Sequence, residues 1–258
     1  MTVTGNLDAA ANAIRSATNV IYLTGAGISV ASGIAPYRKS REAVWSRFHT
    51  DWGTTQAFES RTLDWWTQFW KPTRANIAVD RHPNAAHHAL VRLAAAGAGH
   101  TVITQNIDGL HLKAGHPAQQ LVEVHGRTGL FRCVEPGCVH FSRELLPPFD
   151  DAMLDRGEIP LCPACGAKIR PLVLLFDEIY LSHPFFQWPR TQRLLEQAEV
   201  MIFAGTSFSV GITTMALEQV HHRRIPAYNF NIEAVPGLTN VRGPCEETLV
   251  QLAGLITP

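Results

Sequence analysis

Short apolar strands alternate with helices along most of this 258-residue chain, and this alternation limits its fold more than any other feature of the sequence. Each expected strand ends in a polar or glycine-containing segment. Because parallel strands need crossover connections, usually helices, the pattern predicts an α/β fold with a doubly wound parallel sheet. The expected strands are 19–24, 100–104, 121–124, 199–203 and 225–232, and the expected helices are 7–18, 84–96, 190–198 and 245–256.

Two stretches interrupt the alternation, and both have the character of insertions. The first, residues 40–80, is rich in tryptophan, and the second, residues 131–170, carries four paired cysteines. We therefore expect a sheet domain made of 1–39, 81–130 and 171–258, and a small domain made of a helical part, 40–80, and a cysteine-bearing part, 131–170.

Composition and charge exclude several classes of protein. Hydrophobic residues make up 46% of the chain, which suffices for a sizeable core. Twenty-two basic residues balance twenty-two acidic ones, so nothing marks a surface for direct nucleic-acid binding. Neither an apolar run of about 20 residues nor a basic segment leading into a long apolar one is present. We expect a cytoplasmic protein that contacts no membrane.

The four paired cysteines form the most specific local signal. Cys133 and Cys138 make one pair, and Cys162 and Cys165 make the second. Thiolates at such spacings hold one tetrahedral zinc ion, and four of them leave no position for water, so the zinc would be structural. The alternative is a set of free buried thiols, which the paired spacing disfavours. Cys245 stands alone and is, by this reasoning, an ordinary buried thiol.

Polar segments follow three of the expected strands at their carboxyl ends, where open α/β sheets bind ligands. In the segment Gly25–Ser29, glycines would let the backbone approach a pyrophosphate, although the spacing differs from the dehydrogenase pattern. The amides and carboxylate of 105–108 can fix sugar hydroxyls and a carboxamide. His125 lies where a general base would lie. An ordinary turn explains the first two segments as well or better when each is taken alone.

Taken together and in this order, these segments resemble the sirtuin (Sir2) family of NAD-dependent protein deacylases. Further matches are Ser32-Gly33-Ile34, the helix opening Pro83–His87, Gly205-Thr206-Ser207 and Asn229–Glu233, so that the likeness covers nearly the whole chain. It implies a bacterial-type single-domain member with a Rossmann-like doubly wound sheet and a smaller zinc-binding and helical domain built from the two insertions.

The resemblance implies NAD as co-substrate and one structural zinc ion held by Cys133, Cys138, Cys162 and Cys165. It implies that His125 is the general base, that Asn106 orients the ribose and a water, and that Asp108 binds the nicotinamide carboxamide. The catalytic residues would be His125, Asn106 and Asp108. The implied cofactor-binding residues are Gly25, Ala26, Gly27, Ser29, Tyr37, Arg38, Gln105, Asn106, Ile107, Asp108, Gly205, Thr206, Ser207, Asn229, Asn231 and Cys245.

The implied reaction removes an acyl group from a protein lysine. The acyl oxygen attacks the nicotinamide ribose and nicotinamide leaves; His125 then takes a ribose hydroxyl proton, and water releases lysine and O-acyl-ADP-ribose. The acylated peptide would pair as an extended strand with two edges, to which Val173, Phe176, Asp177, Glu178 and Val210 would belong. The alternatives are a protein ADP-ribosyltransferase or NAD hydrolase that uses the same site, and a non-enzymatic binding module.

Three departures from the family pattern bear on substrate choice. Asp177 stands where the family usually has glycine; its carboxylate either points to solvent or disfavours acidic substrates by like charge. Tyr37 stands where phenylalanine is usual. The stretch 65–72 lacks the Tyr-x-x-Arg pair of family members that remove succinyl or malonyl groups, so dicarboxylic acyl groups are disfavoured. Its tryptophans either line an apolar acyl pocket or pack as a core, and their helical spacing favours the core.

Overall fold

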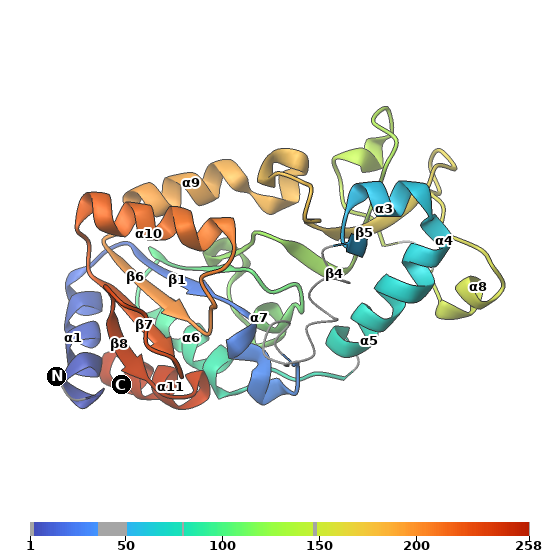
Figure 1. Ribbon diagram of the computed structural model, residues 1–258. Coiled ribbons are helices and arrows are strands. Elements are labelled where there is room, and N and C mark those ends of the chain that lie inside the picture. The colour runs from blue at the N-terminus through green and yellow to red at the C-terminus, as the bar shows by residue number, and fades with distance from the viewer. Residues whose placement is uncertain (1–2, 36–50, 79, 147–148, 258) are drawn as a thin grey trace. The chain divides into compact units, whose positions relative to one another are not determined.

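The computed structural model describes residues 3–35, 51–78, 80–146 and 149–257, and it divides the chain into two compact units (Figure 1). The implied cofactor-binding residues Tyr37 and Arg38 lie outside the described residues. The first unit consists of Met1–Ala35, Arg81–Val122 and Pro189–Pro258, and the second of Pro36–Asp80 and Glu123–Trp188. Residues 123–130 and 171–188, which the sequence analysis placed with the sheet, group here with the second unit.

The first unit is built on a six-stranded sheet in the order β3-β2-β1-β6-β7-β8. Neighbouring strands from β2 to β8 run parallel. From β1 the chain continues to β2 and β3 on one side of β1, and it later adds β6, β7 and β8 on the other side. The carboxyl end of β1 therefore lies at the switch point where such sheets bind ligands. The strands are β1 (Val20–Thr24), β2 (His100–Thr104), β3 (Leu121–Glu123), β6 (Val200–Ala204), β7 (Ala227–Asn231) and β8 (Thr239–Arg242).

Helices cover both faces of this sheet. On one face, α1 (Val3–Ser16), α6 (Ala85–Ala95) and α11 (Cys245–Ile256) share a core with the strands. Figure 1 shows α9 (Trp188–Gln197) and α10 (Gly211–Arg223) on the opposite face. The predicted doubly wound parallel sheet is therefore confirmed. The short elements η1 (Ala26–Ser32), α7 (Leu110–Lys113) and η3 (Ala118–Gln120) complete the described elements of the unit.

Apart from the short helical elements η1, α7 and η3, two elements of the first unit, β8 and α10, are missing from the expected strands and helices. Strand β8 has the sequence Thr-Asn-Val-Arg, with one buried apolar residue, and becomes a strand because it pairs with the edge of β7. Helix α10 buries Ile212, Ala216 and Val220 but carries polar residues between them, which weakens its apolar periodicity. In both cases tertiary contacts decide a structure that local sequence leaves undetermined.

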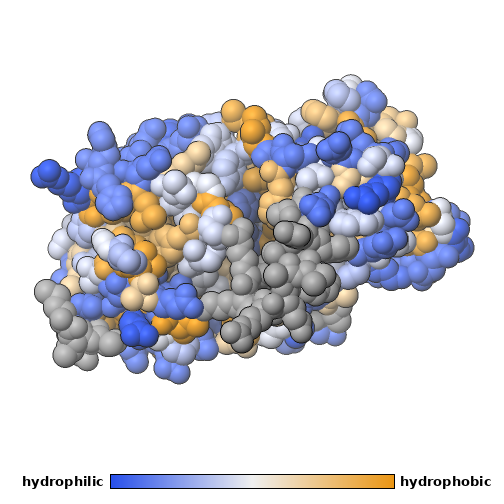
Figure 2. Space-filling view, in the orientation of Figure 1, coloured by the Kyte–Doolittle hydropathy of each residue, from blue (hydrophilic) through white to orange (hydrophobic). Residues whose placement is uncertain are grey.

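The second unit has a two-stranded antiparallel sheet and a tryptophan-rich core. Trp65, Trp66 and Trp70 are almost completely buried, and the rings of Trp65 and Trp70 stack with centroids 5.9 Å apart. The helical spacing therefore marks a packed core rather than an acyl pocket. Figure 2 shows hydrophilic residues over much of the outer surface of α3 and α8. The elements are α3 (Thr55–Ser60), α4 (Thr62–Asp64), the π-helical η2 (Trp65–Trp70), α5 (Lys71–Ala78), β4 (Gly126–Cys133), η4 (Val139–Phe141), α8 (Asp151–Asp155), β5 (Ile169–Val173), η5 (Tyr180–Ser182) and η6 (Pro184–Phe186).

Within the described residues, no helix is both long and apolar enough to cross a membrane.

Buried histidines next to β1 make the stability of the first unit sensitive to pH. The rings of His87 and His111 lie 5.0 Å apart, and His111 Nε2 lies 3.0 Å from the Thr24 hydroxyl. Burial, with a smaller contribution from His88, lowers the pKa of His87 to about 4. Burial also lowers the pKa of His111 well below its ordinary value, and neighbouring histidines add to this effect.

We expect the free energy of unfolding to fall as the pH is lowered from about 6.5, where unfolded histidine begins to bind protons, toward about 4. Above this range both states are neutral, so the full stability is present there. A histidine with the pKa of His87 costs about 2 kcal/mol by about pH 5. Urea unfolding near neutrality and near pH 5 measures the change. His87→Gln is expected to reduce this loss of unfolding free energy, whereas the exposed His222→Gln leaves it intact. The same loss in the His87 variant as in the wild type would contradict the assignment of the pH dependence to His87.

Candidate functional site

The carboxyl ends of β1 and β2 hold a continuous chain of hydrogen bonds made by sequence-predicted residues. Asn106 Nδ2 donates to the Gly25 carbonyl and to Ser29 Oγ, both at 3.1 Å. Ser29 Oγ donates to Asp108 Oδ2 at 2.7 Å, and the Leu110 N–H donates to Oδ1 at 2.9 Å. Burial raises the pKa of Asp108, while these two donors and Lys113 oppose the shift. The chain fixes an amide and a carboxylate that can bind a ribose and a carboxamide.

The loops after β1 and β6 meet backbone to backbone, and glycine makes this approach possible. The Gly27 N–H donates to the Gly205 carbonyl at 2.8 Å. A Cβ on Gly27 would lie 2.6 Å from that oxygen, and a Cβ on Gly205, whose φ is +61°, would lie 2.4 Å from the Ile28 nitrogen. At the start of η1 the surface of the chain is therefore formed by backbone atoms rather than by side chains, so a ligand could approach the backbone closely. Ala26, beside these glycines, is half-buried.

The remaining residues implied for NAD divide into two groups. Gln105 Nε2 donates to the Thr24 carbonyl and to Thr206 Oγ1, both at 3.2 Å, and Asn231 Nδ2 donates to the Thr206 carbonyl at 2.8 Å. These contacts bring the ends of β1, β2, β6 and β7 together. Half-buried Ile107 and exposed Ser207, whose hydroxyl lies 2.5 Å from that of Ser209, border the same ends.

Asn229 and Cys245 lie in the interior instead. The amide of Asn229 donates to the Glu233 carbonyl and to Asn240 Oδ1, both at 2.8 Å. The buried Cys245 Sγ lies 3.5 Å from the Phe230 carbonyl. Burial, and to a lesser extent the charge of Glu246, raises the pKa of the Cys245 thiol to about 12. Both side chains are buried in the first unit, and their part in binding NAD stays a prediction from the resemblance.

His125 belongs to the second unit and joins β3 to β4. Its carbonyl accepts the Leu174 N–H at 2.9 Å. Its Nε2 lies 3.5 Å from the hydroxyl of Tyr180, and the two rings are nearly parallel, 14° apart in plane. Sequence reasoning singled out the histidine but not Tyr180, for which the local pattern offers no signal.

The cysteine cluster fits a metal. The four sulfur atoms lie within 4.8 Å of one another, with Cys133 and Cys165 at 3.5 Å and Cys138 and Cys162 at 3.6 Å. A zinc ion with bonds of about 2.3 Å to four sulfurs sets them about 3.8 Å apart. The thiols therefore suit one structural zinc ion, in agreement with the predicted ligand set.

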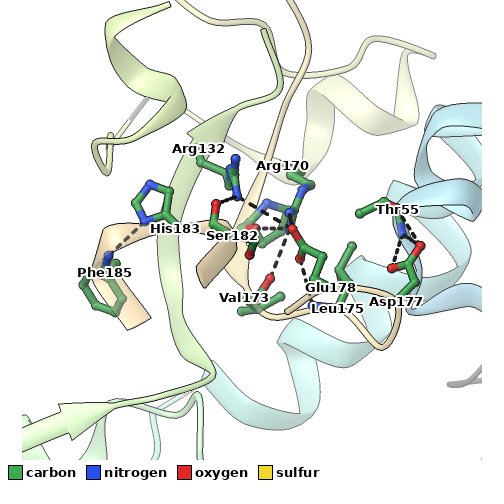
Figure 3. A network of polar contacts seen from close by, with 11 residues as sticks. Thr55, Arg132, Arg170, Val173, Leu175, Asp177, Glu178, Ser182, His183 and Phe185 are labelled. Carbon is green, nitrogen blue, oxygen red and sulfur yellow. Dashed lines mark hydrogen bonds and ion pairs between the residues drawn. The ribbon is translucent and has the colours of Figure 1, made fainter. Parts of the chain in front are cut away.

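Glu178, implied for substrate binding, is the counter-ion of two buried arginines. Arg132 and Arg170 lie opposite each other in the register of β4 and β5. The Glu178 carboxylate pairs with Arg170, lies 3.7 Å from Arg132, and accepts the Leu175 N–H at 3.0 Å (Figure 3). Without this carboxylate two like charges would be buried together, so the side chain of Glu178 stabilises the loop. Sequence analysis did not single out either arginine, and their only signal is a charge flanked by apolar residues, Phe131 and Cys133 in β4 and Ile169 and Pro171 in β5.

Asp177 binds the first turn of α3, which neither interpretation of its carboxylate anticipated. It accepts the Thr55 N–H at 2.8 Å, the Thr55 hydroxyl at 2.6 Å and the Gln56 N–H at 3.3 Å (Figure 3). Although burial opposes the shift, these hydrogen bonds lower the pKa of Asp177. The carboxylate therefore ties the loop after β5 to the helical part of the unit.

Replacing Asp177 with alanine is expected to lower the free energy of unfolding by about 1 kcal/mol, since helix N–H groups lose their acceptor. Asp177→Asn keeps an acceptor and should lose much less. Urea unfolding of both variants measures the difference. Equal stability of the alanine variant and the wild type would show that the contact contributes nothing.

The loop expected to bind a substrate strand already uses several of its N–H groups. Those of Leu174 and Phe176 donate to the carbonyls of His125 and Gly53, both at 2.9 Å. The side chain of Phe176 is 60% exposed, whereas Val173 is buried. Val210, on the other expected edge, is half-buried at the start of α10 in the first unit.

Comparison with known proteins agrees with this arrangement. The profile of the Sir2 family matches residues 25–211. An NAD-dependent deacetylase, sir2E, of Dictyostelium discoideum is 38% identical over 249 residues, covering 91% of this chain and 72% of that protein. An NAD-dependent protein deacylase of Thermus thermophilus is 35% identical over 79% of this chain and 75% of its own length. A solved complex of a Sir2 homolog with NAD is 27% identical, with a TM-score of 0.79 over 96% of this chain and 93% of that one. This chain is a member of the Sir2, or sirtuin, family.

Proposed function

We propose that this protein is an NAD-dependent protein-lysine deacylase that releases nicotinamide and O-acyl-ADP-ribose. The observation that carries the proposal is the Asn106–Ser29–Asp108 chain of hydrogen bonds at the carboxyl ends of β1 and β2. It supplies the amide and carboxylate that the family pattern requires. Relatives named NAD-dependent deacetylase or deacylase, up to 38% identical, support the same activity.

Each part of the chain has a distinct task in this proposal. NAD supplies a ribose carbon from which nicotinamide leaves, and the protein mainly positions the reactants. Asp108 accepts a carboxamide N–H, while Asn106 orients the ribose and a water. His125 takes a proton from a ribose hydroxyl, a role that suits the near-neutral pKa typical of imidazole. A zinc ion held by the four cysteines would stabilise the second unit and, with all four positions filled by sulfur, would take no part in the reaction.

The experiment that tests the proposal measures nicotinamide release with an acetyl-lysine peptide, with its unmodified form, and without peptide. A deacylase releases nicotinamide only with the acylated peptide, because the acyl oxygen is the attacking group. An NAD hydrolase releases it in all three cases. An ADP-ribosyltransferase gives a protein product carrying ADP-ribose, so the acyl requirement and the product together separate the three activities.

Acylated lysines of proteins, bound in extended form, are the substrates in this proposal. The zero net charge supports a protein that does not bind nucleic acid directly. The cysteine cluster, which holds zinc only as reduced thiolates, is typical of a reducing compartment such as the cytoplasm.

A further inference from the structure

Beside His125 lies an aromatic stack made of residues that are remote from it in sequence. The Tyr180 ring centroid lies 5.9 Å from that of the imidazole, and the Tyr180 ring also stacks on Trp188 at 4.6 Å and 16°. The Tyr180 hydroxyl lies 3.5 Å from His125 Nε2. From this geometry we propose that Tyr180 is a positioning residue for His125, the base of the proposed deacylase reaction on which this inference rests.

The backbone at His125 is held in place, but a backbone alone does not orient an imidazole. Gly126 follows with φ +85°, and a Cβ there would lie 2.0 Å from the Leu172 carbonyl, so the chain passes close against β5. The Leu174 N–H holds the His125 carbonyl. The second side-chain torsion of histidine is nevertheless broad and roughly two-fold. A neighbouring ring that lies parallel to the imidazole restricts the range of this torsion.

Tyr180 can serve as such a neighbour because its own loop is fixed on both sides. Two residues before it, Glu178 is held by Arg170 and by the Leu175 N–H. Two residues after it, the Ser182 carbonyl accepts from Arg132 at 3.0 Å (Figure 3). These buried charges are expensive to separate, so they confine the segment that carries Tyr180.

The chemical consequence follows from the two ring nitrogens of histidine. Which nitrogen carries the proton is set by the hydrogen bond that the other makes. The Tyr180 hydroxyl, near Nε2, favours one orientation and one tautomer of the His125 imidazole. The Tyr180 ring, which itself stacks on Trp188, restricts rotation of the imidazole plane. Tyr180 is assigned no contact with NAD or the acyl group, and it acts through His125.

The test compares Tyr180→Phe and Tyr180→Ala with the wild type in two assays. One measures formation of O-acyl-ADP-ribose, and the other measures acyl-peptide-dependent exchange of labelled nicotinamide into NAD. The base acts after nicotinamide leaves, so exchange reports steps that do not need it. We expect Tyr180→Phe to lower kcat for product by about tenfold and Tyr180→Ala by more, within the contribution of a general base. The rate of exchange and the KM for NAD should change by less than about twofold, because neither depends on the general base.

The chain offers a matched control in Tyr22, whose hydroxyl lies 3.1 Å from His100 Nδ1 in the core of the first unit. Tyr22→Phe removes a similar contact, so it should leave the ratio of product formation to exchange unchanged. A merely structural Tyr180 would lower both rates together, and unchanged product formation in Tyr180→Phe and Tyr180→Ala would also overturn the proposal. If the wild type gives neither product nor exchange, the deacylase function itself fails. The ¹⁵N resonances of the His125 ring then test the contact alone, since Tyr180→Phe must shift them.

Discussion

Replacing His125 with alanine is expected to lower the rate of lysine deacylation by about 10²- to 10⁴-fold, the range that a general base contributes. The variant lacks the group that takes the ribose proton, so the reaction stalls after nicotinamide has left. Acyl-dependent exchange of nicotinamide into NAD should persist, because it precedes proton removal. Steady-state rates of both processes, measured on the same preparation, check the prediction.

The control for this variant is His222→Ala, which removes an exposed histidine at the end of α10 in the first unit. It should keep both rates. Far-ultraviolet circular dichroism verifies that the His125 variant is folded. Deacylation at the wild-type rate without His125 would remove this residue from the mechanism, and loss of exchange together with deacylation would assign it to binding instead.

Removal of the metal is expected to unfold the cysteine-bearing part of the second unit. A structural zinc ion contributes about 10–16 kcal/mol in small zinc-folded domains. That is as large as the whole stability of a typical domain, about 5–15 kcal/mol. A chelator, or Cys162→Ser, should therefore expose the chain between Cys133 and Cys165 to proteases and lower the melting temperature.

The matched control is Cys245→Ser, which changes a buried thiol outside the cluster. Elemental analysis should find one zinc ion per chain in this variant and in the wild type, and less in Cys162→Ser. A metal-free protein with unchanged protease resistance would show that the four thiols hold no structural metal.

Much of the sheet could be predicted because the residues within each strand and helix, rather than distant partners, indicate its structure. Strand β1 is a short apolar run that leads into a glycine segment, and β2 has β-branched residues at four of its five positions. The helices α1 and α6 show their apolar faces in the sequence. Strand β8 could not be predicted, since its pairing with β7 rather than its composition makes it a strand.

The same distinction applies to the site. The segments Gly25–Ser29 and 105–108 follow strands directly, so their convergence follows from sheet topology. The partner of Asp177 is Thr55, 122 positions away, and the interval contains no pattern that connects them. The stacking of Tyr180 on His125 is equally non-local. Position along a strand predicts which polar residues reach the sheet edge, whereas the contacts that orient them depend on tertiary packing.

Following the acyl group itself tests the proposed deacylase activity most sharply. The purified protein is incubated with NAD and a peptide whose acetyl-lysine carries ¹³C in the acetyl group, and the products are identified by mass spectrometry. We expect the label to appear in O-acetyl-ADP-ribose, in amounts equal to the deacetylated peptide and to nicotinamide. Label in free acetate from the start of the reaction, or NAD cleavage with the acetyl group still on the peptide, would contradict it.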